Sequence, residues 1–188
     1  MKIFLYFFGL LLIGSCSQPQ INGQEVFDEV FVQVVDSTLI DRRIYLGTGY
    51  TEKQKDSIRN IPSKPVVAID ERMIIMNSDL KDIPKEYRIP EDTAAWVLHP
   101  EKFNASKYIF KKSSEIMDGP MFEKWPVQYP GFTGLLSFSK IYFDPKAENG
   151  MMAVVYSCNA GCGIGYLVYL KKTGRIWKVH RVKQTWIS

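Results

Sequence analysis

The residues with the most defined chemistry in this sequence are its three cysteines, Cys16, Cys158 and Cys162. A thiolate can attack an electrophile, bind a metal ion or pair with a second thiol in a disulfide. Cys16 follows a short apolar segment near the start of the chain, whereas Cys158 and Cys162 flank Asn-Ala-Gly between two runs rich in β-branched and aromatic residues. The surroundings of each cysteine therefore indicate which chemistry it performs.

The segment before Cys16, residues 1–15, has the features of a secretory signal. Lys2 precedes an apolar run over residues 3–13, and the small residues Gly14 and Ser15 follow it. This run is too short to cross a hydrocarbon core of ~30 Å, which needs about 20 helical residues. We therefore expect residues 1–15 to be removed from the mature protein.

The tetrapeptide Ile13-Gly14-Ser15-Cys16 resembles the lipobox of bacterial lipoproteins. The resemblance implies cleavage before Cys16, diacylglycerol on its sulfur and an acyl chain on its new amino group. Several acyl chains hold a protein on a membrane that a single chain holds only marginally. The alternative is an ordinary signal peptide followed by a chance cysteine. Some bacteria sort lipoproteins by the residue after the cysteine, and because Ser17 is not acidic, the resemblance implies the outer membrane in such bacteria. Residues 16–24 would form a polar tether between the lipid and the domain.

The pair Cys158 and Cys162 is predicted to form a disulfide, because two thiols at short spacing in an oxidising compartment readily oxidise. Two buried free thiols, or a redox-active or nucleophilic cysteine, are the alternatives. The spacing has three intervening residues, whereas thiol oxidoreductases have two. A zinc site would need both cysteines to meet His99 and His180, which lie in unrelated segments. We predict no metal, no cofactor and no catalytic residue.

The composition is that of one ordinary globular domain. The chain has 188 residues, 46% hydrophobic and 23% charged, with a formal net charge of +4. The doublets Lys111-Lys112 and Lys171-Lys172 are isolated, and no stripe of cations marks a single element. Nucleic acid is therefore not expected as a partner.

Regular elements are easiest to predict near the two ends of the mature chain. Residues 25–40 carry an apolar stripe at helical spacing, which predicts a core helix. Residues 137–188 predict a four-stranded antiparallel meander, with Trp177 on its core face and Lys178 and His180 on a solvated face. Between them we predict a helical turn at 52–59 and short strands at 65–69, 73–76 and 108–110.

These elements predict an α+β domain over residues 25–188, an antiparallel sheet with the N-terminal helix packed on it. The pattern from Tyr156 to Ser188 resembles uncharacterised bacterial lipoproteins and secreted α+β domains. Its last hairpin, with the tract Gly174-Arg-Ile-Trp-Lys-Val179, is similar to that of cystatin-like or nuclear-transport-factor-2-like sheets. Such folds include both binding modules and enzymes, so the fold alone implies no activity.

The expected function is that of a lipoprotein of the bacterial cell envelope, held on the membrane by lipid, whose domain binds an unknown protein or small molecule without catalysis. The alternatives are a periplasmic hydrolase-like enzyme using His180 or a carboxylate in the concavity of the sheet, and an inhibitor or immunity-type protein. A binding module predicts an exposed aromatic patch, for which Trp96, Trp125 and Tyr129 are the candidate residues. An enzyme predicts a polar cleft with converging titratable groups.

Overall fold

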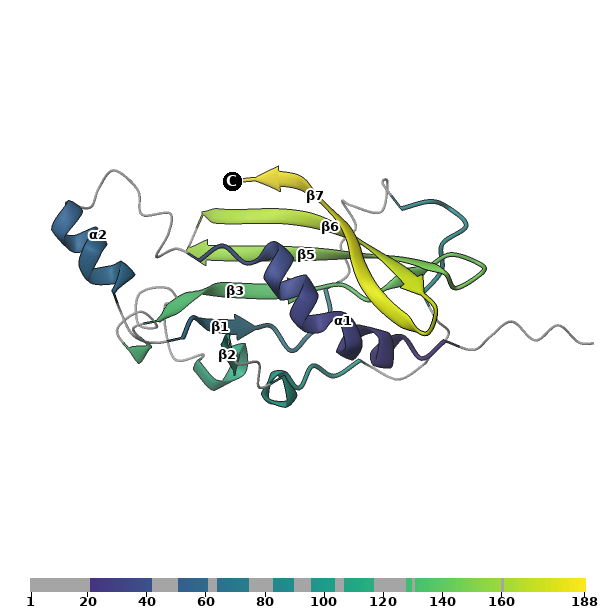
Figure 1. The fold of residues 1–188 in the computed structure, drawn as a ribbon, viewed down its shortest axis with the longest axis horizontal. Coiled ribbons are helices and arrows are strands. Elements are labelled where there is room, and N and C mark those ends of the chain that lie inside the picture. Colours follow the sequence, from purple (N-terminus) through teal and green to yellow (C-terminus); the bar gives the residue numbers. More distant parts are fainter. Residues whose placement is uncertain are drawn as a thin grey trace, which may run out of the picture.

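Seven β-strands form one mixed sheet in the computed structural model of this protein (Figure 1). The structure describes residues 21–41, 51–60, 64–74, 83–89, 96–103, 107–116, 128–129, 131–159 and 161–188. The strands are β1 Val66–Ile69, β2 Ile109–Lys112, β3 Phe132–Phe138, β4 Tyr142–Phe143, β5 Asn149–Asn159, β6 Cys162–Thr173 and β7 Ile176–Ile187. The helical elements are α1 Gly23–Thr38, α2 Glu52–Arg59, η2 Pro100–Lys102 and η3 Ser113–Ile116.

The predicted meander is present as the antiparallel neighbours β3, β5, β6 and β7. Strand β5 is central in the sheet, and both of its faces are largely buried, which agrees with the apolar residues on both sides of this strand. The β6–β7 hairpin turns through Gly174 and Arg175, with Gly174 at a φ of 64°. Glycine adopts this left-handed conformation without steric strain, so it allows the compact connection between Thr173 and Ile176.

The prediction of a purely antiparallel sheet is wrong. Strand β1 pairs in parallel with both β2 and β3, which gives the strand order β2-β1-β3-β5-β6-β7. Parallel neighbours need a long crossover connection, and the segment from Ile69 to Ile109 is long enough to provide one. The four-residue runs of β1 and β2 carry no signal of strand direction, so only the tertiary structure decides it.

Two predicted strand boundaries also change. The first strand of the meander is predicted to begin at Ser137, but β3 begins at Phe132 and ends at Phe138, and the chain bends before the short β4. At this bend the Ser139 hydroxyl accepts a hydrogen bond from the Ala153 backbone N–H at 2.8 Å, in place of a backbone carbonyl. In the predicted strand 73–76, residues 73 and 74 have no strand structure, and residues 75 and 76 lie outside the described residues.

Helix α1 confirms the predicted core helix, although it begins two residues earlier and ends two residues earlier. Residues 23 and 24 therefore belong to the helix rather than to the tether. Asn22 caps the N-terminus by accepting hydrogen bonds from the backbone N–H groups of Gln24 and Glu25 at 3.1 and 3.3 Å. The β-branched stripe lowers intrinsic helix propensity, so burial of the stripe against the sheet must stabilise α1.

Helix α1 lies across one face of the sheet, which we call the α1 face (Figure 1). Its two phenylalanines, Phe27 and Phe31, are fully buried there and contact the ring of Phe138 on β3. Trp177 of β7 is also buried in this cluster, as predicted, and its ring contacts Phe143. We call the opposite side of the sheet the outer face.

Candidate functional site

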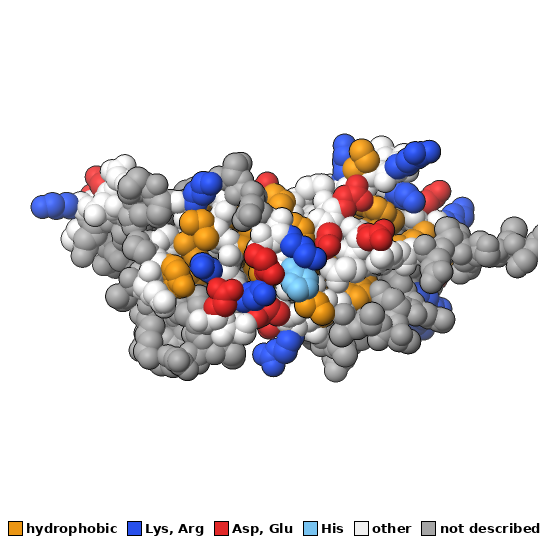
Figure 2. Space-filling model, turned by 90° about the horizontal axis from the view of Figure 1, so that it is seen from below, with side chains coloured by type: hydrophobic (Ala, Val, Ile, Leu, Met, Phe, Trp, Pro, Cys, Tyr) orange, Lys and Arg blue, Asp and Glu red, His pale blue; other side chains and the backbone are white. Residues whose placement is uncertain are grey.

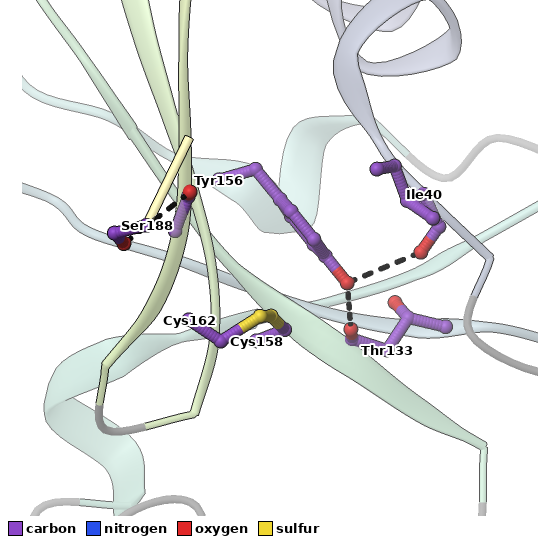
Figure 3. The surroundings of a disulfide bond; sticks show 7 residues. Ile40, Thr133, Tyr156, Cys158, Cys162 and Ser188 are labelled. Atoms are coloured by element: carbon purple, nitrogen blue, oxygen red, sulfur yellow. Dashed lines mark hydrogen bonds between the residues drawn. A yellow bond between two sulfur atoms is a disulfide. The ribbon is translucent and has the colours of Figure 1, made fainter. Parts of the chain in front are cut away.

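Cys158 and Cys162 lie at disulfide-bonding distance at the end of the β5–β6 hairpin, with Cα atoms 5.3 Å apart (Figure 3). The neighbouring Tyr156 is buried, and its hydroxyl donates towards the carbonyl oxygens of Thr133 at 2.6 Å and Ile40 at 3.2 Å. These contacts tie the hairpin end to β3 and to the segment after α1. Because Cys158 is itself buried in the core, the pair is placed for a structural role.

Mass spectrometry of the unreduced, alkylated protein is expected to show Cys158 and Cys162 linked. Replacing both by serine is expected to lower the free energy of unfolding by about 2 kcal/mol, from the entropy relation for a small closed loop. Under reducing conditions, the wild type and this double variant should unfold at similar denaturant concentrations. Two alkylated thiols in material from an oxidising compartment would contradict the assignment.

The two histidines cannot complete a metal site with these cysteines. His99 precedes η2, which packs against the edge strand β2, whereas His180 lies on β7 at the opposite edge of the sheet. His99 has its own partner, since its Nδ1 lies 3.2 Å from a carboxylate oxygen of Glu101. Within the described residues, no three His, Cys, Asp or Glu side chains gather closely enough to hold a metal ion.

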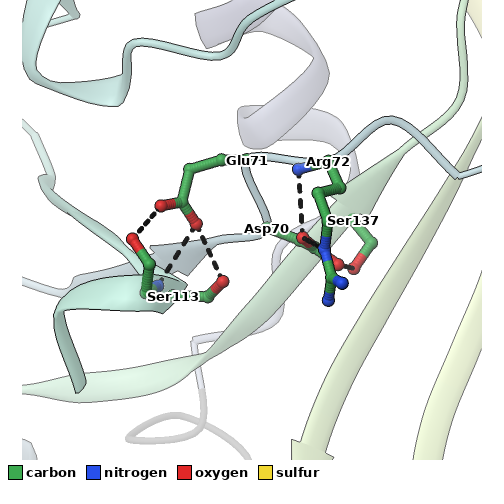
Figure 4. Close-up of polar contacts among 6 residues, drawn as sticks. Asp70, Glu71, Arg72, Ser113 and Ser137 are labelled. Atoms are coloured by element: carbon green, nitrogen blue, oxygen red, sulfur yellow. Dashed lines mark hydrogen bonds and ion pairs between the residues drawn. The ribbon is translucent and has the colours of Figure 1, made fainter. Parts of the chain in front are cut away.

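Two carboxylates that follow β1, those of Asp70 and Glu71, connect this strand to β3 and to η3 (Figure 4). The Glu71 carboxylate accepts hydrogen bonds from both hydroxyls and one backbone N–H of Ser113 and Ser114, at the start of η3. Partial burial raises the pKa of Glu71, but these hydrogen bonds outweigh it and the pKa is lowered overall. Asp70 accepts hydrogen bonds from the Arg72 backbone N–H at 3.1 Å and, weakly, from the Ser137 hydroxyl at 3.4 Å. Both groups thus have structural partners.

The side of the molecule seen in Figure 2 carries acidic and basic side chains interspersed with each other. Asp36 of α1 binds Lys107 at 2.7 Å and the Tyr108 hydroxyl at 2.6 Å. Partial burial raises the pKa of Asp36, but these two hydrogen bonds lower it overall. Glu101 likewise lies 3.3 Å from Lys112. Each of these two carboxylates therefore has a basic partner among the described residues.

The aromatic residues expected on an exposed patch do not form one together. Trp96 is buried in the core next to Phe27, so the expectation for this residue is wrong. Tyr129 is half-buried, with the Lys111 ammonium 5.7 Å from its ring centre. Trp125 lies outside the described residues.

The β6–β7 hairpin carries a charge imbalance that the sequence pattern did not predict. Residues 149–188 contain no Asp or Glu but six Lys or Arg, all exposed on this hairpin: Lys171, Lys172, Arg175, Lys178, Arg181 and Lys183. The cations are spread over two strands, so no single run of sequence looks basic. The absence of acidic residues after Glu148 is the signal that could have revealed the imbalance.

Four of these cations share the outer face of the sheet, which strand pairing and the alternation of side chains establish. Lys171 pairs directly with Lys178, Tyr169 with Arg181, and Leu167 with Lys183. The Arg181 guanidinium lies 4.0 Å from the centre of the Tyr169 ring, a cation–π contact that orients it. We call Lys171, Lys178, Arg181 and Lys183, together with Tyr169 and Trp186, the basic hairpin face.

Trp186 extends the basic hairpin face over two glycines of the neighbouring strand. It pairs with Gly165, and a Cβ atom added to Gly165 would collide with the indole ring. A Cβ atom on Gly163 would lie 3.1 Å from the same ring. Because neither glycine has a side chain, the indole ring can lie against the backbone of β6. The Trp186 side chain remains 36% exposed and available to a partner.

Comparison of the chain with models of known protein families, with curated proteins and with solved structures finds no match. Among the described residues, no helix has both the length and the apolar character needed to span a membrane.

Proposed function

We propose that this protein is a lipid-anchored lipoprotein of the bacterial cell envelope, whose domain binds an anionic partner without catalysis. The observation that supports the binding role is the basic hairpin face, where four cations and Trp186 are exposed, Tyr169 is half-buried, and neither strand contains an acidic residue. The sequence Ile13-Gly14-Ser15-Cys16 after the apolar run supports the anchor.

The electrostatics of the basic hairpin face favour a bound anion. Lys171 and Lys178 are direct cross-strand neighbours, and like charges in this position destabilise a sheet. A carboxylate or phosphate placed between two ammonium groups would remove this repulsion and gain two charge-assisted hydrogen bonds. Because the lysines are exposed, salt should screen the attraction over a Debye length of ~8–10 Å.

Binding of soluble polyglutamate to the non-acylated domain, residues 16–188 with Cys16→Ser, tests the binding role. This chain retains every described helix and strand. We expect saturable binding at low salt that weakens steeply as salt increases, and a several-fold weaker affinity after Lys171→Gln and Lys178→Gln, because two of the four cations on the face are lost. The matched control is Lys53→Gln, which removes an exposed cation from α2.

Isothermal titration calorimetry across a range of salt concentrations would measure both effects. Unchanged binding in the lysine pair variant, or no binding at any salt concentration, would contradict the assignment of the basic hairpin face.

A further inference from the structure

Among the described strands, β7 is an edge strand of 12 residues, and the two hydrogen bonds from its backbone to α1 both lie in its first half. The Trp177 backbone N–H donates to the Glu29 carboxylate at 3.1 Å, and the Val179 N–H donates to the Gln33 side-chain oxygen at 3.1 Å. These side chains of α1 satisfy donors that a neighbouring strand would otherwise satisfy. An edge protected in this way is closed to further strand pairing.

The second half of β7 has outward-directed backbone groups beyond the reach of these two contacts. In antiparallel pairs, residues that exchange hydrogen bonds alternate with residues whose backbone groups point away from the partner strand. On β6, Lys172 donates its N–H to Glu148 on the β5 side, and Gly163 exchanges hydrogen bonds with Ser188 on the β7 side. Even-numbered residues of β6 therefore face β5, and their partners on β7 direct their backbone outward.

Strand β7 has two bulges, each with one residue more than the facing part of β6, and the outward-directed positions follow from the pairing on either side of them. They include Trp177 and Val179, whose backbone N–H groups point away from β6 and donate to α1. The remaining three are Val182, Gln184 and Ile187, the partners of Val168, Tyr166 and Ile164. We call the segment 182–187 the open edge. It provides a row of donors and acceptors that an extended chain could pair with.

The side chains along the open edge differ between the two faces of the sheet. On the outer face, Arg181 and Lys183 lie beside it, and no acidic residue lies on either strand of the hairpin. On the α1 face, the half-buried Val182 and the 68% exposed Ile187 lie along it. A strand added here would place alternate residues next to cations and next to apolar side chains.

We propose that the open edge of β7 binds an extended acidic segment of a partner protein by strand addition, with acidic and apolar residues alternating along that segment. This inference rests on the proposed function and specifies its anionic partner as a polypeptide. A second copy of this chain fits less well, because its own Arg181 and Lys183 would come close to those of the first copy, and like charges across paired strands are destabilising.

A pair of short peptides tests the inference on the non-acylated domain, residues 16–188 with Cys16→Ser. The first peptide alternates glutamate and valine. The second has the same sequence with a methyl group on every backbone nitrogen, which keeps its charge but removes the donors along both edges of the peptide. Because strand addition depends on several backbone hydrogen bonds, we expect the methylated peptide to bind at least about tenfold more weakly.

Variants of the protein separate the contributions of backbone and charge. Gln184→Pro removes an outward N–H, and proline is tolerated on an edge strand when its nitrogen faces away from the partner strand. We expect this variant to bind the unmethylated peptide several-fold more weakly, and Arg181→Glu with Lys183→Glu to abolish detectable binding. Lys53→Glu on α2 is the matched control and should bind like the wild type.

The outcomes distinguish this inference from the proposed function. Equal binding of both peptides would overturn strand addition and would indicate that the protein binds anions by charge alone. Tight binding to anionic lipid vesicles or to nucleic acid, without binding of either peptide, would also overturn strand addition. Failure of both peptides and of polyglutamate would overturn the proposed function as well. If Gln184→Pro does not fold, the comparison of the two peptides on the wild-type domain still decides the question.

Discussion

Replacing Phe31 by alanine is expected to lower the free energy of unfolding by about 3 to 5 kcal/mol, the range for removing a buried phenylalanine ring. Phe31 is fully buried between α1 and the sheet. Its ring stacks on Phe103 at 4.1 Å between centres and meets the edge of Phe110 at 5.1 Å. Alanine would leave a cavity lined by these rings. Urea denaturation followed by circular dichroism would measure the loss.

Two further variants give this experiment its controls. Phe31→Leu should cost clearly less, because leucine fills part of the same volume. Ser37→Ala, at an exposed position near the end of α1, should change stability by at most about 0.5 kcal/mol. A loss below about 1 kcal/mol for Phe31→Ala would show that α1 does not pack on the sheet as the structure has it.

Replacing Cys16 by alanine is expected to abolish acylation and to release the protein from the membrane fraction. The anchor proposed here depends on one sulfur and the amino group beside it. Without Cys16, neither the diacylglycerol nor the amino-terminal acyl chain could be attached, and each buried CH₂ of those chains contributes about 0.8 kcal/mol to membrane binding. Metabolic labelling with a palmitate analogue, followed by membrane fractionation, measures both effects.

The control for this experiment is the double variant Cys158→Ala and Cys162→Ala, which removes the other two thiols and should keep the full label. Label that persists after Cys16→Ala would reject lipidation at this residue. Loss of label without any change in fractionation would instead show that something other than the acyl chains holds the protein on the membrane.

Most of the α1–sheet core could be predicted from the sequence because it depends on local periodicity. The apolar stripe of residues 25–40 repeats with the helical period, and burial of one face follows from that repeat. The alternating and apolar runs after residue 149 define three long strands, and Gly174 marks the turn between the last two. Each of these patterns depends only on residues that lie close together in the sequence.

The basic hairpin face and the open edge could not be predicted in the same way. Lys171 and Lys178 become neighbours only when β6 and β7 pair in the observed register. Two bulges in β7 each change which side chains reach the outer face, and nothing in the local sequence places them. The protection of Trp177 by Glu29 joins residues far apart in the chain.

By itself, the sequence determined the positions of α1 and the long strands, and the close spacing of Cys158 and Cys162, because each depends on neighbouring residues. Only the tertiary structure decided that β1 is parallel to its neighbours, that α1 hydrogen-bonds to the first half of the β7 edge, and that no other described strand pairs with the second half. The physical reason is that strand direction, register and edge protection are settled by packing between distant segments, and that packing leaves no periodic trace in any one of them.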